Sequence, residues 1–599
     1  MNLFDDQRFL IRSRAPDDDS LKQLRLSWKK IMTSEFDYRP RFDYSLEYMN
    51  VAALGLLIGL TQAFFEPETI EDIPHRLEKP LSEDEFEAGI APHRSVFGID
   101  DDIRFMQGTE PETDAKGRLT KVSPIGELLL SVKRGDKEFL NRPATNWGVC
   151  LDQIPLLLFS RSTFYEKSAG RGYLTGTTGD LEIRTFLIDP NSLRRTIWLN
   201  VLAKSEQSQH FKLANSGEGY DDWMWNRLPK TSEVPAGDIS LRSGLFWTVA
   251  NLWVDIQEVE EPHHCLVSGE IIPPGKRAGR GVVVNSTGIA FGATVEREDG
   301  KGARQSFFRH PNAPYKHITP KNNKPDFTTH IEVHEKSGLI GEMGGLFYAT
   351  GEGTTHRGSG VQYYIAPVLE QLAGINRHLI DEYYIDTARR YDLFCFGFHM
   401  LSSKKNVHGG YESELFSYPL LGTNPEERKE AMTKAETILN GFASTTHTVD
   451  EILCSGVQMC VMEEIDLTEN DSGIIQISQR SRIDNNGPIR DASRELWKSA
   501  GMELNRMVEK IGDLKTAEEI GRSQQLLMTN WTDKIVDKAI HIFNRYFNDA
   551  AYSRSADLML AAHNARRLFN WKLAQMDAEI FERRKSRFNQ NNSNNGGSQ

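Results

Sequence analysis

From residue 421 onward, apolar side chains recur at intervals of three and four, the spacing that one buried face of an α-helix requires. The first run follows Asn424-Pro425-Glu426-Glu427, which places an N-cap, a proline at the first helical position and two acidic residues at the positive end of the helix dipole. Four or more such runs with short connections predict a helical bundle over residues 421–589.

The first 420 residues mix two periodicities. Helical patterns occupy residues 50–65 and 82–90, and Ser82-x-x-Glu85 forms a capping box at the start of the second. Strand patterns occupy residues 181–188, 281–285 and 327–333. We therefore predict an α+β protein in which a large mixed domain, 1–420, precedes the bundle. Residues 590–599 contain only Asn, Gly, Ser and Gln, which predicts a disordered tail.

The longest apolar run, from Val51 to Phe65, is shorter than the roughly 20 residues that a membrane-spanning helix needs. It also contains Gly55, Gly59 and Gln62, so we expect a buried helix and no membrane partner. The chain opens Met-Asn-Leu-Phe-Asp-Asp, without a basic and then apolar leader. Its five cysteines form no Cys-x-x-Cys pair, which favours a reducing compartment. These features predict a soluble cytoplasmic protein.

The net charge of −13 argues at first against nucleic-acid binding, but it hides an uneven distribution. Residues 66–114 carry 15 acidic and 4 basic side chains, whereas residues 276–324 carry 10 basic and 3 acidic ones. Polyanion binding needs clustered cations and not a positive total. One basic face on an acidic body is therefore compatible with the sequence, as is a chance fluctuation.

No catalytic or metal-binding motif is complete in the sequence. His330 and His334 lie four apart in a strand-like stretch, without the helical metalloprotease pattern. The segment Pro262–Cys265 contains two histidines and a thiol but no second cluster that would complete zinc coordination. The glycine-rich stretch 351–358 lacks the Gly-Lys-Ser/Thr ending of a phosphate-binding loop. We expect no enzymatic activity, no cofactor and no bound metal.

Three polar segments suit contact with a nucleic acid. Phe139-Leu140-Asn141-Arg142-Pro143 places an aromatic ring beside an amide and a cation, a combination that can stack on and hydrogen-bond to an unpaired base. Ala169-Gly170-Arg171-Gly172 lacks bulk, so its backbone can approach a groove. Strand patterns at 393–401 and 411–418 flank Ser402–Gly410, which predicts a hairpin with a cationic tip that can enter a base step. A core phenylalanine and ordinary surface loops are the alternatives.

The sequence resembles the CasA family, the large subunits of the type I-E CRISPR Cascade. Matching stretches keep the family order over essentially the whole chain. They include Leu46-Glu47-Tyr48 through Gln62, Pro80–Phe86 with Ile90-Ala91-Pro92, Phe105-Met106-Gln107, Phe139–Pro143, Leu193–Leu202 and Gly244–Trp247.

The resemblance implies a non-catalytic subunit of a prokaryotic, cytoplasmic antiviral complex. Such a subunit assembles with crRNA and the other Cascade subunits, and it inspects the protospacer-adjacent motif (PAM) of double-stranded DNA from the minor groove. It then starts duplex opening and R-loop formation, and a helicase-nuclease docks afterwards. Guide pairing reads the rest of the target sequence.

The resemblance also assigns roles to individual residues, which we state as expectations. Phe139, Leu140 and Asn141 match the loop that engages the crRNA handle. Lys167, Ala169, Gly170, Arg171 and Gly172 match the glycine loop at the PAM, with Lys167 where the family usually has glycine. Lys405, Asn406, Val407, His408 and Gly409 match the wedge hairpin, with His408 where a glutamine is familiar.

Two further basic features follow from the same resemblance. A lysine finger is expected within residues 297–304; Asp299 aligns best, so we assign the role to Lys301. Lys321 and Lys324 match a basic patch that faces the incoming duplex. Some members carry a cysteine-rich knuckle around Cys265, but the other thiols are missing here, so we expect no zinc.

Two other functions stay open. A nuclease on a Cascade-like scaffold would need a cluster of carboxylates, histidine and metal, and a metal-dependent cleavage assay would detect it. A purely structural assembly subunit would make the basic loops incidental. Neutralising the hairpin distinguishes that case, because DNA binding would then be unaffected.

Overall fold

The computed structural model describes most of residues 2–576. The parts outside the described residues are 1, 6–7, 17, 109, 116–118, 121, 130–146, 165–182, 211–221, 227–232, 235–238, 249–250, 286–289, 292–293, 297–301, 305–307, 320–326, 334–336, 350–360, 373–390, 401–407, 420, 423–424, 462–466, 470–474, 478–486, 515, 553–555 and 577–599. The chain forms two compact units, 1–332 with 355–420, and 333–354 with 421–599.

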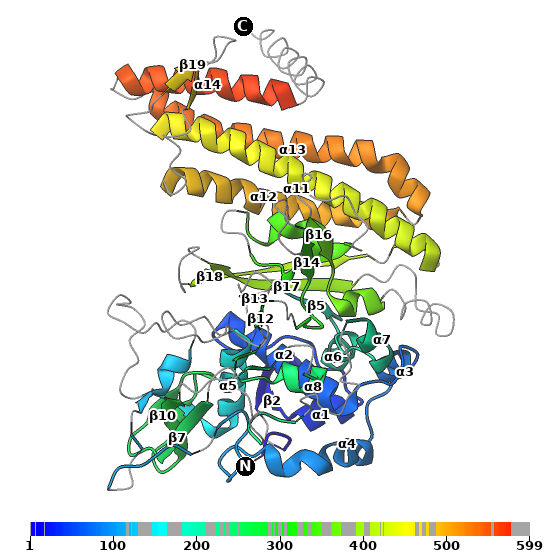
Figure 1. Ribbon diagram of the computed structural model, residues 1–599, viewed down its shortest axis with the longest axis vertical. Coiled ribbons are helices and arrows are strands. Elements are labelled where there is room, and N and C mark those ends of the chain that lie inside the picture. Colours follow the sequence, from blue (N-terminus) through cyan, green and yellow to red (C-terminus); the bar gives the residue numbers. More distant parts are fainter. Residues whose placement is uncertain are drawn as a thin grey trace. The chain divides into compact units, whose positions relative to one another are not determined.

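The first unit is built around helix α2 (Glu47–Phe65), which is buried along most of its length (Figure 1). It packs against α5 (Ile154–Thr163), α6 (Leu193–Leu199) and α8 (Leu241–Leu245). Gly55 and Gly59 let Phe159 and Phe246 approach the helix closely. Length and composition alone would allow α2 to cross a membrane, yet 72% of its most apolar window is buried inside the protein. The expected buried helix is confirmed.

Several short elements surround α2, and Trp28 and Phe86 among them contact Phe65 at its carboxy-terminal end. The hairpin of β1 (Phe9–Ala15) and β2 (Asp18–Leu26) is followed by α1 (Trp28–Thr33), α3 (Asp72–Glu78), α4 (Glu83–Ile90) and the 3-10 helix η1 (Ala91–Val96). As predicted, Ser82 caps α4: its hydroxyl accepts a hydrogen bond from the Glu85 backbone at 3.1 Å. Trp28 is fully buried here and packs edge-on against Phe86.

The largest sheet has the order β3-β10-β4-β8-β9, and β7 (Asn251–Glu258) pairs along the whole length of β10 (Arg277–Asn285) on the edge opposite β3 and β4. Its remaining strands are β3 (Ser123–Pro124), β4 (Trp147–Cys150), β8 (His263–Cys265) and β9 (Ile271–Ile272), with the short helices η2 (Ile125–Leu128) and η3 (Leu151–Gln153) beside it. The predicted strand at 281–285 is confirmed as the second half of β10.

Several smaller sheets complete the first unit. Two have two strands each, β6 (Glu233–Val234) with β11 (Ala290–Phe291), and β12 (Thr294–Glu296) with β13 (Gly302–Arg304). A third joins β14 (Tyr315–Ile318), β15 (Phe327–His330) and β16 (Val361–Tyr364), and a fourth joins β5 (Arg184–Ile188), β17 (Tyr391–Met400) and β18 (His408–Tyr418). Helix α7 (Lys204–His210) follows α6.

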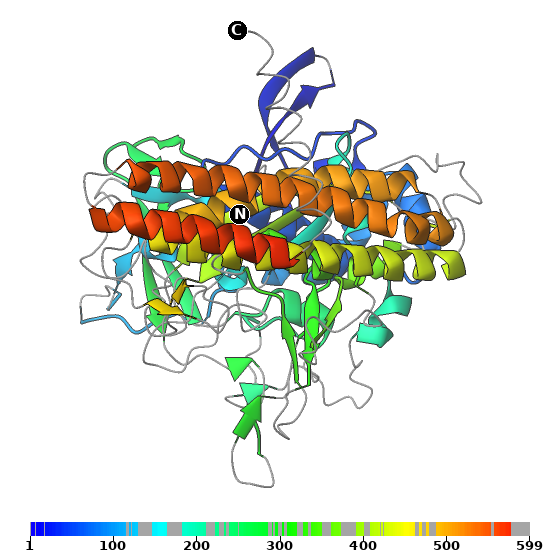
Figure 2. The same cartoon turned by 90° about the horizontal axis from the view of Figure 1, so that it is seen from above.

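The second unit is a bundle of four long helices, α11 (Pro425–Val461), α12 (Gly487–Asp513), α13 (Ala517–Ala551) and α14 (Ala556–Met576). Figures 1 and 2 show them side by side, and α11 contacts each of the other three. Thr516 and Glu519 form a reciprocal capping box at α13. The α+β class with a carboxy-terminal helical region is therefore confirmed. A small hairpin, β19 (Leu467–Glu469) with β20 (Ile475–Ile477), lies within the polar stretch after α11.

One part of the second unit comes from earlier in the chain. Residues 333–354, which the sequence analysis placed in the first domain, contain η5 (Leu339–Glu342) and α9 (Met343–Phe347). Helix α9 packs against α11, and the side chain of Ile340 reaches Gly501 of α12. The single boundary at 420 was therefore incomplete, because this segment buries its apolar residues against the bundle. The predicted tail, 590–599, lies outside the described residues.

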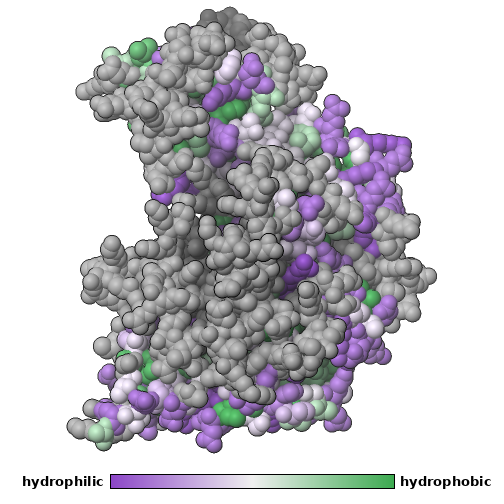
Figure 3. Space-filling view, in the orientation of Figure 1, coloured by the Kyte–Doolittle hydropathy of each residue, from purple (hydrophilic) through white to green (hydrophobic). Residues whose placement is uncertain are grey.

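Most of the exposed large apolar side chains among the described residues are separated along the chain, for example Leu21, Ile271, Met502 and Leu526, whereas Met559 and Leu560 are adjacent. The described part of the face in Figure 3 is mostly hydrophilic, with small apolar patches. Scattered exposed apolar residues are normal for a folded protein and do not mark a binding site.

Candidate nucleic-acid interface

The sheet of β18, β17 and β5 holds the hairpin that the sequence predicts as a wedge. Strands β17 and β18 pair antiparallel from Tyr391 opposite Tyr418 to Met400 opposite His408, with a register shift between Phe398 and Met400. Leu393, Cys395, Phe396 and Phe398 of β17 are buried, so apolar packing fixes the base of the hairpin. The ladder thus supports a rigid projection whose connection is formed by residues 401–407.

The position of His408 and Gly409 corrects the sequence analysis. Both were expected in the turn, but they belong to β18, and His408 lies opposite Met400. The two glycines at 409 and 410 suggested a turn. The β17–β18 ladder nevertheless continues past them, from the pair Phe398–Tyr411 to the pair Met400–His408, with a register shift between these pairs. The other three wedge residues, Lys405, Asn406 and Val407, lie outside the described residues.

The segment that contains the predicted glycine loop is attached to this same sheet. Helix α5 ends at Thr163, and the ring of Phe164 packs against Phe396 and Phe398 at centroid distances of 5.6 and 5.4 Å. At the far side of the segment, the Ile183 backbone donates a hydrogen bond to the Ile331 carbonyl at 2.8 Å. Lys167, Ala169, Gly170, Arg171 and Gly172 lie between these anchors, outside the described residues.

The strand register brings these two segments to one end of the sheet. Arg184, the first residue of β5, lies opposite Phe396, and Ile188 lies opposite Asp392. Because the pairing is antiparallel, the chain before Arg184 and the chain after Met400 leave the sheet at the same end. Segments 165–182 and 401–407, far apart in sequence, therefore start from neighbouring points.

A second hairpin is joined to the free edge of β5. The Thr185 backbone donates to the Asn312 carbonyl at 2.8 Å, just before β14, and Ile331 directly follows β15. Strands β14 and β15 pair from Tyr315 opposite His330 to Ile318 opposite Phe327. Lys321 and Lys324 lie between the two strands, outside the described residues, at the hairpin end that is remote from Ile331.

Two other predicted segments are bounded by described strands. Phe139, Leu140 and Asn141 lie outside the described residues, within 130–146. Both flanks of that segment pair with β10, since Pro124 lies opposite Gly281 and Cys150 opposite Ala278. Lys301 also lies outside the described residues, next to Gly302, which faces Glu296 across the β12–β13 ladder.

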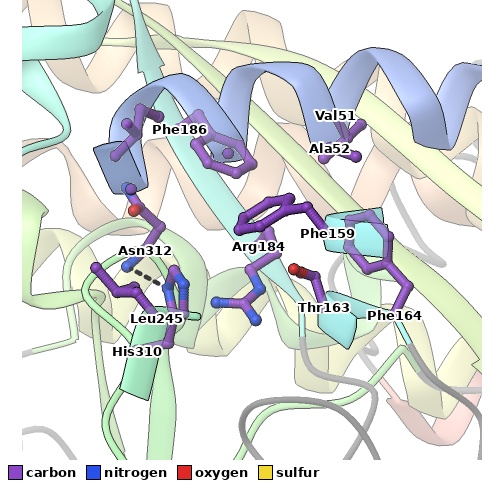
Figure 4. A pocket seen from close by; sticks show the side chains of 13 residues that line it. Val51, Ala52, Phe159, Thr163, Phe164, Arg184, Phe186, Leu245, His310 and Asn312 are labelled. Carbon is purple, nitrogen blue, oxygen red and sulfur yellow. Dashed lines mark hydrogen bonds between the residues drawn. The ribbon is translucent and has the colours of Figure 1, made fainter. Parts of the chain in front are cut away.

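A small buried pocket lies beside the β5 end of this sheet, between α2, α5 and β5 (Figure 4). Its walls are apolar except for Thr163, Arg184, His310 and Asn312. The Asn312 backbone donates to Nδ1 of His310 at 3.1 Å, and its amide donates to Oδ1 of Asn200 at 2.9 Å. These bonds fix the chain that leads into β14.

Burial strongly affects the histidines near this pocket. The pKa values of His310 and His330 lie well below the usual range, first because burial disfavours the charged form and then because the positive charge of Arg184 repels it. Both rings are therefore neutral at ordinary pH. Arg184 is only 1% exposed, so a buried cation lies at the base of this candidate interface.

The comparisons with known proteins agree with this architecture. A family model described as CRISPR-associated protein Cse1 matches residues 25–542. The chain belongs to the Cse1 family. The resemblance to CasA-type large subunits that the sequence analysis identified is thereby confirmed.

Solved structures of similar fold cover nearly the whole chain. CasA from Thermus thermophilus is 12% identical with a TM-score of 0.61, covering 96% of this chain and 99% of that one. Cse1 from Acidimicrobium ferrooxidans is also 12% identical with a TM-score of 0.61, covering 97% and 99%. A chain of a CRISPR RNA-guided surveillance complex is 9% identical with a TM-score of 0.54, covering 91% and 98%.

The histidines that the sequence analysis considered as metal ligands do not form a metal cluster among the described residues of this Cse1-family chain. Among the described residues, no group of three or more His, Cys, Asp and Glu side chains could hold a metal ion. His330 is buried in β15 near the charge of Arg184, which disfavours a second cation, and His334 lies outside the described residues. The Nε2 atom of His263 contacts Arg280.

The sequence analysis did not identify two polar residues of this candidate interface, Arg184 and His310. Arg184 lies in the predicted strand 181–188, between Ile183 and the apolar run Phe186–Ile188, and His310 lies outside every predicted helix and strand. A charged residue inside an apolar strand pattern was the available signal, because a buried arginine is rare unless it has a role.

Proposed function

We propose that this chain is the large, PAM-recognising subunit of a crRNA-guided type I-E Cascade complex. Family membership and the fold shared with a chain of a surveillance complex support an assembly of this kind. Its partners are crRNA, the other subunits, double-stranded target DNA and a helicase-nuclease that docks after R-loop formation. Its location is the prokaryotic cytoplasm, where crRNA and invading DNA meet.

The described residues that flank segments 165–182 and 401–407 lie at one end of the β18-β17-β5 sheet, and this arrangement carries the proposal. A small, glycine-containing loop suits close approach to the minor groove, where A·T and T·A pairs look alike. A rigid hairpin beside it suits insertion into the adjacent base step. Recognition and opening then occur at neighbouring points, so PAM binding places the wedge where unpairing must begin.

The proposed role is non-catalytic. Guide pairing supplies sequence specificity along the target, so the protein needs only to read a short motif and hold backbone. The described residues contain no candidate metal cluster of the kind a nuclease would use. Incubation of the isolated chain with labelled duplex and Mg²⁺ or Mn²⁺ should leave the duplex intact; cleavage would establish the alternative nuclease function.

Charge reversal of the basic patch tests the DNA contact. The double variant Lys321→Glu, Lys324→Glu should weaken binding of the assembled complex to all duplexes about equally. It should also reduce the log–log salt slope by about two, since each lost phosphate contact removes close to one unit. The control carries the same charge change at the exposed residues Lys30 and Lys79. A changed preference among PAM sequences would contradict the assignment to phosphate contacts.

Removing the crRNA-handle contacts tests assembly. The variant Phe139→Ala, Asn141→Ala should bind the rest of the guide complex more weakly, because a base loses a stacking surface worth about 1–3 kcal/mol. This corresponds to roughly 5–150-fold in Kd. Native mass spectrometry or titration measures it, with Tyr552→Ala, which removes an 86% exposed aromatic ring, as the control. Equal affinities for the two variants would refute the role of this loop.

The same variants separate a DNA-recognition subunit from a purely structural one. A structural subunit would tolerate charge reversal at Lys321 and Lys324 without loss of DNA binding, and it would be affected only at the crRNA-handle loop. The proposed function predicts that the Lys321 and Lys324 variant loses DNA binding, whereas the Phe139 and Asn141 variant loses assembly with the guide complex.

A further inference from the structure

Two cysteines that are distant in sequence meet where strands β4 and β8 of the largest sheet pair. Strands β4 and β8 run parallel, with Gly148 opposite Cys265, and the Leu266 backbone donates to the Gly148 carbonyl at 2.9 Å. The backbone N–H of Cys150 donates to the sulfur of Cys265 at 3.3 Å. The two cysteines are therefore in direct contact through this backbone N–H and the Cys265 sulfur.

A tight turn after Cys265 directs further donors at its sulfur. The Cys265 backbone donates to the Glu270 carbonyl at 2.8 Å, and Gly269, with a φ of 75°, donates to the Cys265 carbonyl at 2.9 Å. This turn brings Ser268 beside the same sulfur, and the Ser268 hydroxyl also donates to Oε2 of Glu270 at 3.1 Å. Cys150 and Ser268 therefore both lie next to the buried side chain of Cys265.

This arrangement favours the thiolate form of Cys265. The hydrogen bond from Cys150 and then those from Ser268 lower the pKa of Cys265, whereas burial opposes them. The pKa of Cys150 is raised, first because its thiol donates to Cys265 and then by burial. The pair thus consists of one sulfur held as a nucleophile and one held as a thiol beside it.

The other cysteines lack this combination. Burial raises the pKa of Cys395 and of Cys460, and Cys454 hydrogen-bonds to Asp450 on its own helix. A closed zinc site needs four ligands, and no third His, Cys, Asp or Glu joins the pair among the described residues. Two thiols in contact, one of them half exposed, fit redox chemistry better than metal binding.

We propose that Cys150 and Cys265 form a redox-active thiol pair that hydrogen peroxide converts into a disulfide between β4 and β8. The Cys265 thiolate attacks one peroxide oxygen, which breaks the O–O bond, releases hydroxide and leaves a sulfenic acid. The Cys150 sulfur then attacks the sulfenic sulfur, and its proton leaves with the hydroxyl group as water. Two electrons pass from the sulfurs to the peroxide, and the hydroxide takes up the proton that Cys265 had lost.

The disulfide would tie β4 to β8 at Cys150, the last residue of the strand that follows residues 130–146. If the proposed function holds, that segment carries the crRNA-handle loop, so oxidation would covalently fix the strand at which that segment ends. The redox chemistry itself does not depend on the proposed function, and it is tested on the free chain.

The test treats the reduced full-length chain with hydrogen peroxide in the presence of a chelator, then blocks the remaining thiols and maps the digest by mass spectrometry. We expect a peptide linked through Cys150 and Cys265, while Cys395, Cys454 and Cys460 stay reduced. The control Cys454→Ser should form the same link. Absence of the link, or oxidation of Cys454 as fast as that of Cys265, would overturn the proposal.

Two variants separate the roles of the sulfurs and guard against misfolding. In Cys150→Ser, Cys265 should stop at the sulfenic acid, which a dimedone probe labels. In Ser268→Ala, which keeps both thiols, loss of a donor should slow the peroxide reaction of Cys265 several-fold. Absence of a dimedone adduct on Cys265 in Cys150→Ser, or an unchanged rate in Ser268→Ala, would contradict the assignment.

Discussion

Replacing residues 401–407 by a two-residue Asn-Gly turn should abolish R-loop formation on a fully paired target. Met400 and His408 face each other at the end of the ladder, so the shortened turn can close the same pair of strands. Inserting a hairpin tip into a base step costs a few kcal/mol of unstacking, which guide pairing offsets once the seed forms. Without the tip, weak binding to PAM-bearing duplex should persist.

The β19–β20 hairpin offers a matched control. Its connection, residues 470–474, can be shortened to the same Asn-Gly turn between Glu469 and Ile475, which face each other. Electrophoretic mobility shifts with the assembled complex measure initial binding and R-loop formation separately. If both shortened proteins formed R-loops at the wild-type rate, the 401–407 segment would be an ordinary surface turn.

The second large effect concerns the bundle. Trp531 of α13 is fully buried, its ring stacks on Phe442 at a centroid distance of 4.5 Å, and its Nε1 donates to the Phe442 carbonyl at 3.0 Å and to Thr446 at 3.1 Å. Trp531→Ala should lower the free energy of unfolding of the second unit by about 3–5 kcal/mol, because a cavity replaces a well-packed ring.

Denaturant titration followed by circular dichroism measures this loss on the full chain. Leu526→Ala is the control, because Leu526 lies on the same helix and is 64% exposed, so its truncation should change the unfolding free energy by less than about 0.5 kcal/mol. Identical unfolding midpoints for the two variants would show that Trp531 does not organise the core of the bundle.

Periodic patterns determined most of the fold that could be predicted. The bundle helices repeat an apolar face over many residues, so their type was evident from spacing, whereas α2 was evident from its long apolar run. Residues 333–354 escaped this reasoning, because Ile340 finds its partner Gly501 more than a hundred residues later. Contacts so remote in sequence leave no local periodicity.

The candidate site was predictable in outline and not in detail. The hairpin followed from two aromatic strands around a polar stretch, but its turn was placed too far along because Gly409 and Gly410 continue the ladder. The pairing of β5 with β17, which joins the two proposed DNA segments, could not be seen from sequence, since strand order depends on tertiary packing. Arg184 could not be placed at that junction from sequence for the same reason.

Permanganate footprinting of displaced thymines tests the central claim most directly, because it reports unpaired bases next to the PAM. The assembled complex containing the protein shortened at 401–407 is compared with wild type on a paired target and on a target with a pre-melted bubble beside the PAM. Our account predicts no thymine reactivity on the paired target and wild-type reactivity throughout the R-loop on the bubble, where the opening cost has already been met. Wild-type reactivity on the paired target, or no rescue on the bubble, would contradict it.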